Sequence, residues 1–278
     1  MNYQRALAWS IFWIGLSMLV AICIARIWGT APAEAFLTGY ALEKALSIDN
    51  LFVFLMLFTH FGVERHAQRR ALNYGVIGVI ILRGLMIFGG IALIDTFQWV
   101  LYIFGAVVIY TGFVMAFGKE KGFDPERSRT VKIVRRFVRI SEEYHGTRFF
   151  IREGAVRVAT PLFLVVCVIE LMDIVFAVDS IPAIFAVTRN PWIVFSSNML
   201  AVLGLRALYF LLERAREAFR FVKQGVGIIL WFIGVKMLLP AFWPDAVIGN
   251  ATALSVVVAI LMLSILLSVT VKEKNSDA

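Results

Sequence analysis

Acidic residues stand inside two apolar stretches of this 278-residue chain. The first stretch, EKALSIDNLFVF, occupies residues 43–54, and the second, IELMDIVFAVDSIPAIFAV, occupies residues 169–187. A carboxylate in the middle of a bilayer costs about 2.5–3.5 kcal/mol on insertion scales, so such residues generally serve transport, ligand binding or proton relay. The two stretches therefore predict a functional site inside the membrane.

The candidate ligands of this site are all oxygen donors. They are the carboxylates, amide and hydroxyl of Glu43, Asp49, Asn50, Glu170, Asp173, Asp179 and Ser180, with the Ser47 hydroxyl beside them. No histidine lies near the middle of an apolar stretch, and Cys167 lies away from the centre of the cluster. Oxygen donors suit Mg²⁺, Ca²⁺ and Mn²⁺, whereas zinc and copper usually take nitrogen or sulfur. An acidic cluster would repel an oxyanion, so the sequence predicts a hard divalent cation as the substrate.

Besides Lys236, three cationic residues stand inside apolar stretches, namely Lys44, Arg83 and Arg206. We expect them, or bound protons, to offset the carboxylates when no metal is bound, which makes proton exchange against metal a natural coupling. The alternative is that these cations form permanent ion pairs that order the bundle. For Lys44 the two interpretations, a stand-in for the departed cation and a permanent partner of one acid, remain open.

Helix geometry restricts how one ion could reach these acids. Glu43 and Asp49 are six residues apart, which separates their directions by about 120° on an α-helix, and the same holds for Asp173 and Asp179. Either the helix is irregular near residues 47–50, or other helices complete the ligand shell. Pro182 removes a backbone donor close to Asp179, and an unwound turn there would free carbonyl oxygens as additional ligands.

The elements that position these residues are apolar stretches long enough to cross a bilayer. Hydrophobic residues make up 60% of the chain, and charged residues make up 17%. About 20 apolar residues span the hydrocarbon core, and eight stretches qualify: 7–27, 33–60, 71–94, 97–117, 159–188, 193–212, 219–239 and 246–270. The fold class is therefore an all-α polytopic membrane protein, with residues 1–278 forming a single transmembrane domain.

The distribution of basic residues predicts the orientation of the chain. With eight spans, 21 of the 27 Lys and Arg residues lie on the side of the two termini, while only Arg26 and Arg189 lie on the other side. Cytoplasmic loops carry the excess of basic residues. We therefore expect both termini in the cytoplasm.

The segment 118–158 is the one sizeable part expected outside the bilayer. Its stretch TVKIVRRFVRI places Val131, Val134 and Val138 on one helical face among basic residues. This pattern predicts a helix on the anionic inner leaflet. Binding of nucleic acid is not expected, because no aromatic stacking pattern accompanies the charge.

Two parts of the chain are similar to each other. When Glu43 is aligned with Asp173, Asp49 meets Asp179 and Asn50 meets Ser180. Further matches follow in order: Arg83 with Arg206, and Phe97, Val100, Gly105, Gly112 and Met115 with Phe219, Val222, Gly227, Gly234 and Met237. We interpret spans 2–4 (33–117) and spans 5–7 (159–240) as two copies of a three-helix unit, flanked by helices 7–27 and 246–270. Because three is odd, the second copy is inverted, as in many secondary transporters.

Several segments resemble the TerC family of integral membrane proteins. They are EKALSIDNLFVF, WVLYIFGAVVIYTG, TPLFLVV, FAVDSIPAIFAVT and SSNMLAVLGLRALYFLL, and the similarity covers residues 40–240. The family's acidic motifs map onto Glu43, Asp49 and Asn50, and onto Glu170, Asp173, Asp179 and Ser180. One departure is the stretch AQRR at residues 67–70, where a histidine would be expected in place of Arg69.

The resemblance implies an inner-membrane protein related to the lysine-exporter superfamily, several of whose TerC members are linked to manganese efflux. Export of Mn²⁺, with Ca²⁺ as second choice, is thus the function that we expect, and the direction rests on the resemblance. The alternative is a non-transporting membrane partner in tellurite resistance or membrane-protein biogenesis, because family members are associated with these processes. No nucleophile elbow, phosphate loop or organic-cofactor motif is present in the sequence, so an enzyme is not expected. The oligomeric state does not follow from the sequence.

Overall fold

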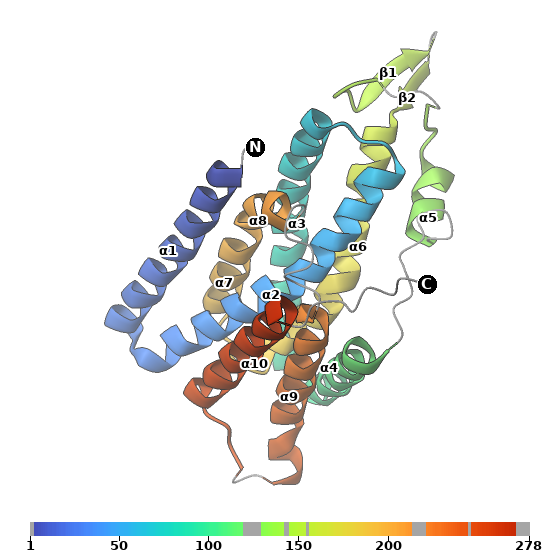
Figure 1. Cartoon of the computed structure of the whole chain (residues 1–278). Coiled ribbons are helices and arrows are strands. Elements are labelled where there is room, and N and C mark those ends of the chain that lie inside the picture. Colours follow the sequence, from blue (N-terminus) through green and yellow to red (C-terminus); the bar gives the residue numbers. More distant parts are fainter. Residues whose placement is uncertain are drawn as a thin grey trace, which may run out of the picture.

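A computed structural model describes residues 3–118, 129–141, 145–153, 156–212, 221–243 and 246–270 of the chain. Within helices and strands, the side chains of Tyr3, Asp49, Arg129, Glu153, Arg206 and Leu212 also lie outside the described part. The described elements form an α-helical bundle with one short hairpin (Figure 1). The prediction of an all-α polytopic membrane protein is confirmed in its fold class.

The helices follow the predicted stretches closely. In chain order the elements are α1 (Tyr3–Trp28), α2 (Thr30–His60), α3 (Arg65–Thr96), α4 (Val100–Phe117), α5 (Arg129–Phe137), β1 (Phe150–Glu153), β2 (Val156–Ala159), α6 (Pro161–Phe185), α7 (Pro191–Leu203), α8 (Leu205–Leu212), α9 (Val222–Phe242) and α10 (Asn250–Thr270). The start of α6 illustrates the local causes. Thr160 accepts a hydrogen bond from the Phe163 backbone N–H, and Pro161 occupies the first turn, where a missing N–H costs nothing.

Seven helical segments in the described part are long and apolar enough to cross a membrane. They correspond to α1, α3, α4, α6, α7 with α8, α9 and α10. Helix α2 has 31 residues but carries Glu43, Lys44 and Asp49 near its middle, and it is not among the seven. It contacts α1, α6, α7, α9 and α10, so other helices surround it (Figure 1). The charged helix is therefore sheltered by the apolar ones, and its crossing of the bilayer stays a prediction.

The structure interrupts one predicted span and excludes two helix irregularities that the sequence left possible. The stretch 193–212 is interrupted at Gly204, which separates α7 from α8. The unwound turn at Pro182 is absent, because α6 continues through this residue to Phe185. Pro182 lies in the last turn, where the helix ends soon afterwards, so little of the helix is disrupted. Likewise α2 is helical through residues 47–50, so the irregularity considered there does not occur.

The segment between α4 and α6 contains α5 and an antiparallel hairpin of β1 with β2. Val131 and Val134 of α5 are buried and belong to an apolar cluster with Leu162 and Val165 of α6. The valine face thus packs against the protein. Ile133 and Phe137 are 50% and 80% exposed, so the predicted lipid contact of this segment stays a prediction that now concerns these two residues.

Helices α4 and α9 lie side by side and approach closely at glycines. A Cβ atom at Gly112 would lie 2.7 Å from the Gly227 carbonyl oxygen, and one at Gly234 would lie 3.1 Å from the Gly105 carbonyl oxygen. In the sequence alignment of the two predicted copies, Gly105 corresponds to Gly227 and Gly112 to Gly234. The contacts are therefore reciprocal, as across a two-fold axis. They agree with the predicted inverted repeat, which itself stays a prediction.

The contacts of α2 and α6 with other helices have the same reciprocity. Helix α2 contacts α7 and α9, while α6 contacts α3 and α4. If α2, α3 and α4 correspond to α6, α7 with α8, and α9, each contact in the first set has its counterpart in the second. Helices α2 and α6 also contact each other. The two acid-bearing helices are thus neighbours in the middle of the bundle.

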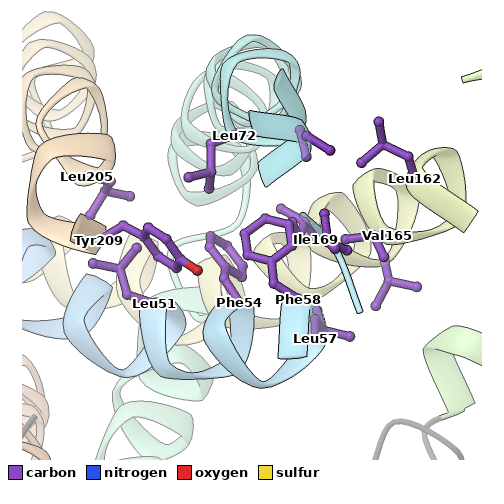
Figure 2. Packing of buried hydrophobic residues seen from close by; sticks show 14 of the residues in the cluster. Leu51, Phe54, Leu57, Phe58, Leu72, Leu162, Val165, Ile169, Leu205 and Tyr209 are labelled. Atoms are coloured by element: carbon purple, nitrogen blue, oxygen red, sulfur yellow. The ribbon is translucent and has the colours of Figure 1, made fainter. Parts of the chain in front are cut away.

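An apolar cluster fills the bundle near the start of α3 and α6 (Figure 2). The labelled side chains come from α2 (Leu51, Phe54, Leu57 and Phe58), α3 (Leu72), α6 (Leu162, Val165 and Ile169) and α8 (Leu205 and Tyr209). A second cluster lies farther along α3 and α6 and includes Ile87, Ile91, Ala177 and Ile181. The level of Arg83 and Asp173 falls between the two clusters along both helices.

Candidate functional site

Arg83 of α3 is the centre of a fully buried polar network. Its Nε and Nη2 donate to the two carboxylate oxygens of Asp173 on α6, at 2.8 and 2.7 Å. Its Nη1 donates to Oε1 of Glu43 on α2 and, at 3.0 Å, to Oδ1 of Asn198 on α7. Asn198 Nδ2 in turn donates to Glu43 Oε2 at 3.0 Å. Four helices are therefore connected by one arginine.

The network is closed to water. Arg83, Glu43 and Asn198 have no exposed surface, and Asp173 is 2% exposed. The Ser47 hydroxyl, one turn after Glu43 on α2, donates to Glu43 Oε1 at 3.3 Å. A paired and hydrogen-bonded charge is the form in which burial is tolerated, and the planar guanidinium matches a carboxylate with two parallel bonds. With both acids ionised, the network keeps one negative charge in excess.

The sequence places Arg83 and Asp173 well inside long helices, far from the helix ends. Arg83 lies 18 residues after the start of α3, about 27 Å along its axis, and Asp173 lies 12 residues after the start of α6. The apolar runs on both sides of each residue form the clusters described above. The polar groups are therefore held at mid-bundle between apolar layers, and none of them can reach water without displacing those layers.

Glu170 lies one turn before Asp173 on α6 and has different surroundings. Both of its carboxylate oxygens are buried and have no hydrogen-bond partner among the described residues. The carboxylate lies against α3, where a Cβ atom at Gly78 would lie 2.5 Å from Glu170 Oε1 and one at Gly75 would lie 3.6 Å from it. The two glycines leave room for the Glu170 side chain. An unpaired buried carboxylate is costly and commonly marks function.

The remaining candidate ligands lie farther along α6 and α2 than Asp173 and Glu43, and they lie on opposite sides of the network, because Leu51 of α2 packs with Ile169 of α6. Asp179 is half-buried and accepts a hydrogen bond of 3.0 Å from the Thr111 hydroxyl of α4. Ser180 is buried, and its hydroxyl has no partner among the described residues. Asn50 of α2 is also buried. The side chain of Asp49 lies outside the described part, so its predicted role as a ligand is not tested.

Lys44 forms no salt bridge with a described acid, and a pairing with Asp49 is not tested because that side chain lies outside the described part. The Lys44 Nζ donates to the Ala201 carbonyl oxygen of α7 at 3.1 Å, beside the break at Gly204, and lies 5.7 Å from the Tyr40 ring centre. A cation at the carboxyl end of a helix is favourable because the unpaired carbonyls carry partial negative charge. Lys44 therefore caps a carbonyl group at the carboxyl end of α7. The side chain of Arg206, the other predicted charge-compensating residue, lies outside the described part.

The described side chains do not converge on a ready metal site. Among them, no three of His, Cys, Asp and Glu are close enough to hold one ion together. Of the predicted ligands, the structure brings Glu43 and Asp173 together on Arg83, places Glu170 on one side of that network and Asp179 with Ser180 on the other. From Glu170 to Asp179 is nine residues, or about 13.5 Å along α6. The acids thus form a series along the bundle.

Asn198 is the member of the network that sequence reasoning missed. It stands in the polar triplet Ser196, Ser197 and Asn198 inside an otherwise apolar stretch, which was the available signal. Gly78 was missed as well, because a glycine in an apolar helix does not reveal which side chain will pack against it.

A model of the integral membrane protein TerC family matches residues 28–276. The chain belongs to the TerC family. This match contains every charged residue of the network and all the predicted ligands. The resemblance inferred from the sequence is confirmed, and the protein is a multi-pass integral membrane protein of that family.

Curated TerC relatives cover nearly the whole chain. A protein of Photorhabdus laumondii named "Putative membrane-bound redox modulator Alx" is 45% identical over 95% of this chain and 85% of its own length. The protein of the same name in Escherichia coli strain K12 is 44% identical over 99% of this chain and 87% of its own length. An uncharacterised membrane protein of Myxococcus xanthus, STKORF319, is 39% identical over 87% of this chain and 76% of its own length. No solved structure matches the chain.

Proposed function

We propose that this TerC-family protein exports a hard divalent cation, Mn²⁺ first and Ca²⁺ second, in exchange for protons. The observation that carries the proposal is the excess of carboxylates over cations along α6. Asp173 is neutralised by Arg83, which it shares with Glu43, whereas Glu170 has no partner and Asp179 has only a hydroxyl among the described residues. Unneutralised carboxylates inside a membrane bundle favour a cation path.

The geometry also refines which candidates would bind the ion. We assign the ion path to two sets of hard oxygen donors on these contacting helices, Asp179 with Ser180 on one side of the Arg83 network and Glu170 with Asn50 and the predicted ligand Asp49 on the other. Glu43 and Asp173 hold Arg83 and so take a positioning role in this proposal. Glu170, on the opposite side of the network from Asp179, would take the proton or receive the ion from the other end of the bundle.

We further place the protein in the bacterial inner membrane with both termini in the cytoplasm. The distribution of basic residues supports this orientation, because segment 118–158 carries a large share of them. The start of α6 and the hairpin then face the cytoplasm, and the α9–α10 connection faces outward. Glu170 lies nearer the cytoplasm and Asp179 nearer the outside.

The proposal is tested by metal sensitivity in a host that lacks its own Mn²⁺ exporters. The intact chain should restore growth in Mn²⁺, and Asp49→Asn and Asp179→Asn should abolish the rescue at equal protein level. Asp95→Asn is the matched control, because Asp95 is an exposed acid at the end of α3. Equal rescue by all variants would refute the metal site.

Proton coupling is tested separately in everted vesicles. Mn²⁺ uptake into the vesicles should release protons from the lumen and should depend on the imposed pH difference. Uptake without proton movement would refute the exchange while leaving metal transport in place.

The name of the relatives in Photorhabdus laumondii and Escherichia coli suggests a different activity, redox modulation. In this chain, a thiol-based role would rest on Cys23, exposed on α1, or on Cys167, half-buried on α6, and both are free. If growth rescue by Cys23→Ser and Cys167→Ser equals that of the intact chain, this route is excluded. A non-transporting partner in tellurite resistance or membrane-protein biogenesis would be favoured instead if Asp49→Asn and Asp179→Asn still supported tellurite resistance or biogenesis.

A further inference from the structure

A cavity of about 340 Å³ lies at the end of the bundle where α6 ends and α10 begins. Its walls come from the residues around the α6 carboxyl end, from α9, and from the start of α10 with the residues just before it. Part of the wall is apolar and includes Phe185, Met237 and Val247. The polar part contains Lys236, Arg189, Thr188 and Asn250. None of these groups takes part in the network around Arg83.

Lys236 is a buried cation in the wall of this cavity. It is 9% exposed, and its Nζ donates to the Ala186 carbonyl oxygen at 3.3 Å and to Asn250 Oδ1 at 3.2 Å. Both acceptors are neutral, and the described lining contains no carboxylate. An ammonium group has three donors, so one remains uncommitted. A buried charge without a counter-ion is unfavourable, so Lys236, which has none in the described lining, favours an anion in the cavity.

Two further positive groups border the same cavity. Arg189 is exposed and makes no hydrogen bond or ion pair with the described residues. The amino end of α10, a helix of 21 residues, begins at Asn250 and adds the partial positive charge of its free N–H groups. The carboxyl end of α6 offsets part of the Lys236 charge through Ala186, but it does not offset Arg189. The cavity is therefore positive overall in its described part.

We propose that this cavity is a binding site for a phosphate group. A tetrahedral anion accepts hydrogen bonds from Lys236, Arg189 and backbone N–H groups at the same time, and guanidinium groups match phosphate oxygens well. The phosphate comes either from solution or from the headgroup of an anionic phospholipid. The apolar part of the wall and the exposed Trp243, just after α9, also fit a lipid at the membrane interface.

Binding is measured with the purified full chain in phosphate-free detergent. In the first arm, inorganic phosphate is titrated against chloride at equal ionic strength while thermal unfolding is followed. In the second arm, native mass spectrometry compares retention of phosphatidylglycerol and phosphatidylcholine. Arg189→Gln and Lys236→Met should each weaken the binding at least about fivefold, since each removes a charge-assisted hydrogen bond.

Arg26→Gln is the matched control, because Arg26 is exposed on α1, lies on the same predicted side and does not line the cavity. It should leave the binding unchanged. If the variants lose the stabilisation by inorganic phosphate, free phosphate is the ligand. If they lose the retention of phosphatidylglycerol, the ligand is the lipid headgroup. If Lys236→Met does not fold, Arg189→Gln decides alone. The proposal is overturned if phosphate stabilises the chain no more than chloride and phosphatidylglycerol is retained no better than phosphatidylcholine. It is also overturned if neither variant weakens the binding.

Discussion

Glu170 and Asp173 stand one turn apart on α6 and face the same neighbouring helix, α3, yet their surroundings differ completely. Asp173 receives two hydrogen bonds from Arg83, whereas Glu170 lies against Gly75 and Gly78 without a partner among the described residues. The difference arises from α3, which offers a cation at one level and bare backbone at the next. Two carboxylates on the same helix thus differ in that Asp173 has a cationic partner and Glu170 has none among the described residues.

The division suggests two roles for acids in this bundle. An acid paired with Arg83 connects helices, because the guanidinium joins Asp173 to Glu43 and Asn198. An acid without a cation keeps its charge available to a proton or metal ion. The following experiments test whether stability and transport separate along this line.

The largest effect is expected from Arg83→Met. The change leaves Glu43 and Asp173 buried without a counter-charge, which should lower the free energy of unfolding by about 3–5 kcal/mol. Thermal unfolding in detergent measures the effect, with Arg26→Gln as an exposed control on α1. The triple variant Arg83→Met, Glu43→Gln, Asp173→Asn should recover much of the loss. An unchanged melting temperature in Arg83→Met would contradict the central role of the network.

Neutralising the two acids of α6 compares them directly. Asp173→Asn removes charge-assisted hydrogen bonds and should lower the free energy of unfolding by about 1.5–3 kcal/mol. Glu170→Gln removes the cost of an unpaired buried charge and should therefore leave the free energy of unfolding unchanged or raise it. Glu170→Gln should lose the rescue of growth in Mn²⁺ although it remains folded and stable. Equal destabilisation by the two variants would refute the comparison.

Gly78→Ala tests the space that α3 leaves for Glu170. The added methyl group would overlap the Glu170 carboxylate, and such overpacking typically costs about 1–3 kcal/mol. Gly89→Ala on the same helix is the matched control, because nothing lies within 4 Å of its added Cβ atom, so helix propensity should make it neutral or slightly stabilising. Combining Gly78→Ala with Glu170→Ala should remove the clash. Identical melting temperatures for the two alanine variants would show that the carboxylate lies elsewhere.

The smallest effect is expected from Lys44→Met. Lys44 donates to the Ala201 carbonyl oxygen at the end of α7, so its loss should cost about 0.3–1 kcal/mol, as for other cations at helix carboxyl ends. The measurement is again the melting temperature. A loss as large as that of Arg83→Met would instead place Lys44 in the charged network.

Much of the site could be predicted from the sequence because membrane insertion depends on local properties. Length and apolar composition place α6 and most other spans within a few residues, and a charge inside such a span is visible without a structure. The acids Glu43, Asp173 and Asp179 were found in this way. The break at Gly204 was not, because the residues around it remain apolar and a single glycine does not distinguish a broken helix from a continuous one.

The sequence by itself determined where the long apolar helices lie, that α2 and α6 carry acids within them, and that the chain resembles TerC proteins. Only the tertiary structure decided that Arg83 holds Glu43 and Asp173 and that Asn198 closes the network. The physical reason is that these partners lie 40 to 155 residues apart, and their pairing depends on the depth and rotation of four helices. Hydrophobic length sets the depth only roughly, whereas side-chain packing between helices fixes the rotation and so determines which acid receives the arginine.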